Sequence, residues 1–182
     1  ESSVHNSTTS SAAQPAAAQL IAADMREVDG VIRRRLASEV VLINQIAEYI
    51  IGAGGKRMRP MLVIMFARAL GFRGPEQHEL AATVEFIHTA TLLHDDVVDE
   101  SSLRRGRATA NALFGNAASV LVGDFLYSRA FQMMVSVNRM RVLEVLADAT
   151  NVIAEGEVLQ LMNMHDPDIA VAEYLRVIRF KT

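Results

Sequence analysis

The sequence predicts an all-α fold, and three observations support that prediction. Hydrophobic residues make up 51% of the 182 residues, and only four residues are Pro. Ala, Leu, Met and Glu, which favour helices, are common, while runs of β-branched residues and clusters of turn residues are few. From Leu20 onward apolar residues recur at intervals of three and four, the spacing of one helix face, and no stretch keeps the alternation of a half-buried strand.

Breaks in the helical pattern occur where Gly, Pro or short polar stretches interrupt it. These breaks fall at residues 52–60, 71–77, 104–107, 114–118 and 165–168. The helices that we expect cover residues 20–36, 39–53, 58–71, 76–99, 107–115, 117–137, 139–164 and 168–180. Asn116 and Asp168 each stand at the start of a helical stretch, so we expect their side chains to cap the free amides of the first turn.

The two ends of the chain differ from its middle. Residues 1–18 are mostly Ser, Thr and Ala and have almost nothing to bury, so we expect a disordered tail without a signal-peptide pattern. The final stretch, "VAEYLRVIRFKT", is still amphipathic at Thr182 and carries no capping Gly. We therefore expect residues 19–182 to be the N-terminal portion of a single all-α domain that continues beyond this chain.

Composition narrows the classes of partner and of chemistry. The formal net charge of −3 gives no overall field that would attract nucleic acid or an anionic membrane, so any basic site must be local. The absence of Cys excludes disulfides and thiol chemistry. The longest apolar runs, such as "PMLVIMFA", are far shorter than the roughly 20 residues of a membrane span. We expect a soluble cytoplasmic protein with no transmembrane segment.

The densest group of charges lies in "LLHDDVVDESSLRRG", which begins at Leu92. Asp95 and Asp99 stand one helical turn apart on one face, with Asp96 beside them, and such like charges repel unless a cation lies between them. Carboxylate oxygens with no His or Cys ligand close by suit Mg²⁺. The alternative is a solvated acidic end of the helix, and for His94 we favour packing or hydrogen bonding over metal ligation.

Arg104 and Arg105 follow the acidic group directly. The planar guanidinium binds phosphate oxygens through two hydrogen bonds, so two arginines beside a magnesium site would suit a diphosphate. The alternative is an ordinary ion pair between Glu100 and Arg104, which are four residues apart.

A second basic group lies in "GAGGKRMRP", where Lys56, Arg57 and Arg59 lead into a helix near Pro60. Gly lets the backbone approach an anion, and a helix N-terminus adds partial positive charge. The alternative is a basic loop in water. His88 lies two turns before Asp95 on nearly the same face, although a lone His on a helix is usually a core residue. Together the groups predict two anion sites, one metal-bridged and one basic, separated by an apolar interior.

Three stretches of the chain resemble a known family: "GGKRMRP", "EFIHTATLLHDDVVDESSLRRG" and "GNAASVLVGDFLYSRAF". They are similar, in order and spacing, to motifs of the head-to-tail trans-isoprenyl (polyprenyl) diphosphate synthases of the bacterial long-chain branch. The resemblance implies an isoprenoid synthase fold around a central cavity, normally a homodimer. It also implies condensation of an allylic diphosphate, such as farnesyl diphosphate, with successive isopentenyl diphosphates. The product would be a long all-trans polyprenyl diphosphate of octaprenyl length, a quinone side-chain precursor.

The resemblance also assigns roles to residues. It makes Asp95 and Asp99 ligands of the cofactor Mg²⁺, supported by Asp96, and gives Arg104 the diphosphate of the allylic substrate. The residues that would hold the diphosphate of isopentenyl diphosphate are Lys56, Arg59, His88 and Arg105. The pair that would contact the allylic substrate, with Lys181 counted as catalytic, is Lys181 and Thr182.

Product length would depend on the depth of a tunnel below the aspartates. In the family, the fifth residue before the first aspartate is a large aromatic in short-chain enzymes, whereas here it is Ala90, followed by Thr91. Small side chains would let a long product pass. For the tunnel floor we expect Phe131, Met133 or Met134, and the alternative for these three is ordinary core packing.

The chain departs from the family pattern at its end, because the second aspartate-rich motif of the family is not in it. We therefore expect this chain alone to be inactive. A terpene cyclase is an alternative, but it would not need the second anion site formed by Lys56, Arg59 and Arg105. A non-catalytic subunit of a heteromeric synthase is another, and the intact "DDVVD" argues against it. Peripheral contact of the protein with a membrane would serve the release of a long product.

Overall fold

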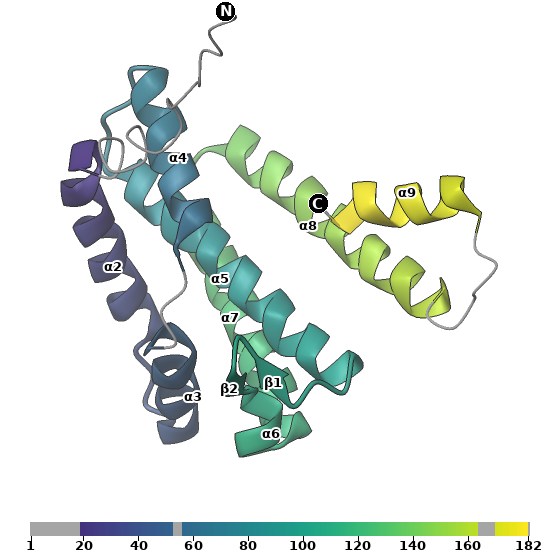
Figure 1. The fold of residues 1–182 in the computed structure, drawn as a ribbon. Helices are drawn as coiled ribbons and strands as arrows, with labels where there is room; N and C mark the ends of the chain where they lie inside the picture. Colours follow the sequence, from purple (N-terminus) through teal and green to yellow (C-terminus); the bar gives the residue numbers. More distant parts are fainter. Residues whose placement is uncertain (1–18, 53–55, 164–169, 182) are drawn as a thin grey trace, which may run out of the picture. The chain divides into compact units, whose positions relative to one another are not determined.

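The computed structural model describes residues 19–52, 56–163 and 170–181, and it is helical as the sequence predicts (Figure 1). Its elements are α2 (Ala22–Leu36), α3 (Val41–Gly52), α4 (Met58–Ala69), α5 (Glu76–Val98), β1 (Leu103–Arg104), β2 (Arg107–Ala108), α6 (Ala110–Phe114), α7 (Asn116–Ser136), α8 (Met140–Asn163) and α9 (Val171–Lys181). The prediction of an all-α fold is confirmed. The tail expected at residues 1–18 lies outside the described residues.

The chain forms two compact units, Glu1–Val137 and Asn138–Thr182. In the first unit, α5 packs against α2, α4 and α7, and Figure 1 shows α5 running beside α7. Ala81, Ala82 and Ala90 of α5 are fully buried, and such small side chains let neighbouring helices approach closely. In the second unit α8 packs against α9.

A buried hydroxyl fixes the contact between α5 and α7 near the acidic motif. Ser119 of α7 is fully buried and its Oγ donates to the carbonyl of Leu93, at 3.1 Å. Leu126 of α7 and Phe86 of α5 are buried in the same hydrophobic core, and each contributes about 2 kcal/mol through burial. The C-terminal turns of α5, which carry the aspartates, are thus held firmly against α7.

The chain between α5 and α6 differs from its prediction. We expected a helix from residue 107, but Leu103 pairs with Ala108 and Arg104 with Arg107 in a two-stranded antiparallel hairpin. Arg105 and Gly106 form its turn with φ of 52° and 77°, the signs typical of a type I′ hairpin turn. The helix α6 therefore begins only at Ala110, where the side chain of Thr109 accepts a hydrogen bond from the Ala112 amide.

The capping prediction at the start of α7 is wrong. Asn116 is the first residue of the helix, and the cap position belongs to Gly115, whose φ of 88° turns the chain sharply between α6 and α7. A side chain at position 115 would be strained, so the cap position is held by a Gly that has no side chain to offer, and Asn116 lies inside the helix. The second predicted cap, Asp168, lies outside the described residues.

Among the helices described here, none combines the length and the apolar composition that crossing a bilayer requires.

A buried ion cluster joins three helices of the first unit. Asp24 of α2 accepts from Arg68 Nε of α4 at 2.6 Å, and its other oxygen lies 2.9 Å from His78 Nε2 of α5. Burial raises the pKa of the Asp24 carboxyl, but the hydrogen bonds from His78 and Arg68 outweigh it and hold the pKa below its usual value. The ionised carboxylate therefore stabilises the native state above that usual pKa, and the contribution is lost as the pH falls below it.

We expect Asp24→Asn to lower the free energy of unfolding by about 2 kcal/mol at neutral pH, because Arg68 and His78 both lose the carboxylate that they contact. Urea denaturation measures the change, and the difference from the unsubstituted chain should shrink in acid. Asp148→Asn, at an exposed position of α8, is the matched control and should change little. Equal effects of the two substitutions would contradict the role of Asp24.

Candidate functional site

A cavity of about 590 Å³ opens between the helices and the hairpin of the first unit. Its basic lining residues are Lys56, Arg57, Arg59, Arg104, Arg105 and Arg107. Its acidic ones are Glu85 and Asp96. The apolar part of the lining includes Ile32, Leu36, Ala47, Leu93 and Leu126. Cations outnumber carboxylates in a partly enclosed space, so the cavity favours an anion that carries an apolar group.

This cavity brings together the two basic groups of the sequence, the Lys56 segment and the double arginine. Lys56 and Arg59 precede or begin α4, whereas Arg104 and Arg105 come from the hairpin, yet all four line the same space. The hairpin turns the chain back after α5 ends, which an extended helix–loop–helix path would not do. Both predicted basic groups therefore line one cavity, and their binding of two separate anions stays a prediction.

One face of α5 forms one wall of the cavity. Glu85, His88, Thr89, Leu92 and Asp96 all line it, at the spacing that places side chains on one helix face. Glu85 and Thr89 were not singled out from the sequence, although their spacing from His88 was a usable signal. Burial raises the pKa of the Glu85 carboxyl, against the opposing charges of Arg57, Arg59 and Arg105.

His88 contacts the basic segment at the start of α4. Its Nε2 lies 3.1 Å from Arg59 Nη1, and because a guanidinium can only donate, Nε2 must be the acceptor. Burial, followed by the charges of Arg59, Arg105 and Arg104, lowers the pKa of His88 from 6.5 to about 4. His88 is therefore a neutral imidazole near neutral pH, and because Nε2 accepts from Arg59, its proton lies on the other ring nitrogen.

This low pKa makes a prediction for stability. Between pH 6.5 and about 4 the unfolded chain takes up a proton at His88 that the folded chain does not, so the free energy of unfolding should fall as the pH falls through that window. Above pH 6.5 the residue should have no effect on the pH dependence. Urea denaturation of the unsubstituted chain and of His88→Gln across this range measures it: the variant should lose less stability toward acid. Identical slopes would contradict the low pKa.

Arg104 forms the closest ion pair of the site with Asp96. Its Nη2 lies 2.7 Å from Asp96 Oδ1, and its Nε lies 3.0 and 3.1 Å from the two carboxylate oxygens. Hydrogen bonding to Asp96 raises the pKa of Arg104. The alternative of a helical Glu100–Arg104 pair is not what forms, because α5 ends at Val98 and Glu100 has a φ of 51° outside it.

Asp95 and Asp99 lie one turn apart at the end of α5, as predicted. Asp99 holds the C-cap position of the helix, where its backbone amide donates to the Asp95 carbonyl at 2.8 Å, and its side chain is exposed. Within the described part of the chain, no three His, Cys, Asp or Glu side chains gather as a metal-binding group. Two carboxylates nevertheless fit Mg²⁺, which takes one or two from the protein and completes its shell with water and phosphate oxygens.

His94 packs against α7, in agreement with its interpretation as a packing or hydrogen-bonding residue. Its Nε2 lies 3.2 Å from the Val120 carbonyl and 3.3 Å from Asp124 Oδ1, and its ring stacks on Tyr127 at 6.0 Å. Gly123 makes this packing possible, because a Cβ there would overlap the imidazole.

The residues expected to set product length do not line the cavity described above. Ala90, Met133 and Met134 are buried, Phe131 of α7 is 44% exposed, and Thr91 donates to the His88 carbonyl at 2.7 Å. Lys181 is the last residue of α9, and Thr182 lies outside the described residues. Roles in chain length and in binding the allylic substrate stay predictions for these residues.

Comparison with known proteins identifies relatives of this chain. Octaprenyl diphosphate synthase of Escherichia coli (strain K12) is 62% identical over 164 residues, which are 90% of this chain and 51% of that protein. A decaprenyl diphosphate synthase from Rhodobacter capsulatus has a crystal structure that matches with a TM-score of 0.87 and 55% identity, covering 92% of this chain and 52% of its own.

A second crystal structure, of a polyprenyl synthase from Caulobacter crescentus CB15 complexed with calcium and isoprenyl diphosphate, matches with a TM-score of 0.88 and 54% identity over 91% of this chain and 51% of that one. These structures confirm the isoprenoid synthase fold that the motifs predict. This chain spans about half the length of the relatives it matches. The family model for polyprenyl synthetase matches residues 40–182, and the chain belongs to that family.

Proposed function

We propose that the protein containing this chain is a Mg²⁺-dependent, long-chain trans-polyprenyl diphosphate synthase. The observation that carries the proposal is the single cavity in which Lys56, Arg59, His88 and Arg105 meet the Arg104–Asp96 pair at the end of the acidic motif. Its relatives named as octaprenyl and decaprenyl diphosphate synthases support a long product. The relative with bound calcium and isoprenyl diphosphate supports a divalent cation acting together with a diphosphate.

The basic residues of the cavity would bind isopentenyl diphosphate and orient its double bond. Lys56, Arg59 and Arg105 supply the positive charge, and neutral His88 supplies a hydrogen bond without adding to the repulsion among them. Asp96 would keep the Arg104 guanidinium pointed at the diphosphate of the allylic substrate. Such preorganised donors stabilise charge that develops in the transition state.

Condensation breaks the bond between the allylic carbon and its diphosphate oxygen, and the diphosphate leaves with the electron pair. The isopentenyl double bond then attacks the allylic cation and forms the new carbon–carbon bond, and the resulting cation would lose a proton to the departed diphosphate, which restores a double bond. When bound at Asp95 and Asp99, Mg²⁺ would neutralise charge on the leaving diphosphate. The apolar lining, including Leu93 and Leu126, would keep water from the allylic cation, which water would otherwise quench.

The test is an assay of a protein that also includes the half of its relatives' length not spanned here. With Mg²⁺, farnesyl diphosphate and isopentenyl diphosphate, we expect a polyprenyl diphosphate, identified by its mass, and no product with EDTA. This chain alone should give no product. A cyclic hydrocarbon formed from farnesyl diphosphate alone would support a terpene cyclase, and activity only with a second protein would support a partner subunit.

Octaprenyl length, a quinone side chain as destination, a homodimer, a cytoplasmic location and peripheral membrane contact during product release are the finer parts of this proposal. Product mass tests the first. Light scattering of the longer protein tests the homodimer, which the family resemblance alone supports. Fractionation of cells would test the location.

Chain length gives a separate prediction at Ala90. We expect Ala90→Phe in the longer protein to shorten the main product, because an aromatic ring would obstruct the path below the aspartates. Ala90 is fully buried between helices, so the ring will also overpack the core by about 1–3 kcal/mol. Product masses from a thermally stable preparation of the variant separate the two effects. An unchanged product length would show that Ala90 lies off the elongation path.

A further inference from the structure

The hairpin that carries Arg104 and Arg105 needs support from outside itself. Each of its strands has only two residues, and a two-stranded hairpin is at best marginally stable alone. Its turn places Arg105 in the left-handed region, with a φ of 52°, which is unfavourable for a residue other than Gly. Asp96 of α5 holds Arg104 of strand β1, so strand β2 needs a contact of its own.

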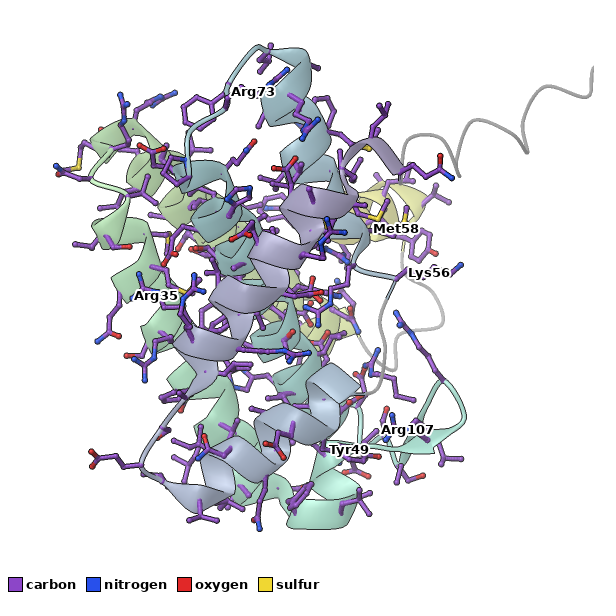
Figure 2. The ribbon with its side chains drawn as sticks, turned by 90° about the vertical axis from the view of Figure 1, so that its left-hand side faces the viewer. Arg35, Tyr49, Lys56, Met58, Arg73 and Arg107 are labelled. Carbon is purple, nitrogen blue, oxygen red and sulfur yellow. The ribbon has the colours of Figure 1, made fainter. Side chains whose placement is uncertain are left out.

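Tyr49 of α3 contacts both residues of β2. Its hydroxyl donates to the Ala108 carbonyl at 2.6 Å, and the Arg107 guanidinium lies over its ring, 4.9 Å from the centroid. Figure 2 shows Tyr49 and Arg107 on the hairpin side of the molecule. The Tyr49 ring is itself held edge-on by Phe114 of α6, with centroids 6.0 Å apart. Tyr49 also lines the cavity.

Tyr49 and Lys56 both line the cavity, and α3, which carries Tyr49, ends at Gly52, four residues before Lys56. The hairpin that Tyr49 contacts carries Arg105. The cross-strand pairs Arg104 with Arg107 and Leu103 with Ala108 transmit the position of β2 to β1. A shift of β2 away from α3 would therefore move Arg104 and Arg105 relative to Lys56.

We propose that Tyr49 is a positioning residue for diphosphate binding, acting through the hairpin. It sets the distance between the Lys56 segment and the arginines of residues 103–108, so that both reach the same anion. This inference rests on the proposed function, because it assumes that the cavity holds a diphosphate. The proposal gives a role in diphosphate binding to Tyr49, which contributes no charge to the site.

The test is calorimetric binding of inorganic pyrophosphate to this chain. Tyr49→Phe keeps the ring contacts and removes only the hydroxyl, and we expect the dissociation constant to rise about fivefold to tenfold. Tyr49→Leu, which also removes the platform under Arg107, should weaken binding further. Tyr174→Phe, at an exposed position on α9, is the matched control and should bind as the unsubstituted chain does.

A double-mutant cycle separates positioning from general stabilisation. If Tyr49 acts through the hairpin, Tyr49→Phe should weaken binding less in the Arg105→Ala background than in the unsubstituted chain. Additive effects of the two substitutions on the binding free energy would overturn the proposal. A Tyr49→Phe protein that has a lower melting temperature but an unchanged dissociation constant for pyrophosphate would overturn it as well. An unsubstituted chain that binds no pyrophosphate would overturn the proposed function and the role of Tyr49 together. If the unsubstituted chain and the Tyr49→Phe variant bind pyrophosphate equally well, only the role of Tyr49 is overturned.

Discussion

Arg104→Ala is expected to lower the free energy of unfolding by about 3 kcal/mol, and Asp96→Ala by about half as much. The asymmetry follows from burial, because the Asp96 side chain is 7% exposed and the Arg104 side chain 39% exposed. Without Arg104, the carboxylate stays buried and loses three hydrogen-bond contacts. Without Asp96, the guanidinium can turn into water.

Chemical denaturation of the two single variants and of the double variant measures this difference. The double variant should cost much less than the sum of the two, because it leaves no unpaired buried charge. Arg141→Ala, which breaks an exposed pair with Glu144 on α8, is the matched control and should cost less than about 1 kcal/mol. If Asp96→Ala proved the more destabilising substitution, Asp96 would have a second role besides holding Arg104.

Much of the first unit could be predicted from local sequence. The apolar spacing of residues 76–99 predicted α5, which runs from Glu76 to Val98, and the spacing of Asp95 and Asp99 predicted their adjacent positions at its end. The basic segment, His88 and the double arginine line one cavity, and their binding of anions stays a prediction. The prediction of α5 succeeded because it depends on the pattern of a single helix.

The hairpin and its pairings could not be predicted in this way. Strands of two residues leave no alternating pattern, and the turn depends on a left-handed conformation at Arg105, a residue that does not usually mark one. The pairing of Arg104 with Asp96 and the contact of Tyr49 with Ala108 follow from the path of that hairpin. The merging of the two basic groups in one cavity is a consequence of the same path.

The pair Asp95 and Asp99 should account for the effect of Mg²⁺. In the longer protein we expect Asp95→Asn combined with Asp99→Asn to lower kcat by about 10³-fold, the scale of losing the main electrostatic stabilisation of a leaving group. In this chain the same substitutions should remove the gain in pyrophosphate affinity that Mg²⁺ gives over EDTA. Binding in EDTA should not weaken, because the basic residues that line the cavity remain.

Variants of the aspartates and variants of the basic residues should therefore differ in whether their effect on pyrophosphate binding depends on Mg²⁺. Lys56→Ala combined with Arg59→Ala should weaken pyrophosphate binding with and without the metal, since their charges do not depend on it. Asp148→Asn, on an exposed part of α8, should leave both measurements unchanged. Retention of the Mg²⁺-dependent gain after both aspartates are replaced would mean that these carboxylates do not hold the cation. In that case the metal reaches the site with the diphosphate alone, and the acidic motif serves chiefly to place Arg104 through Asp96.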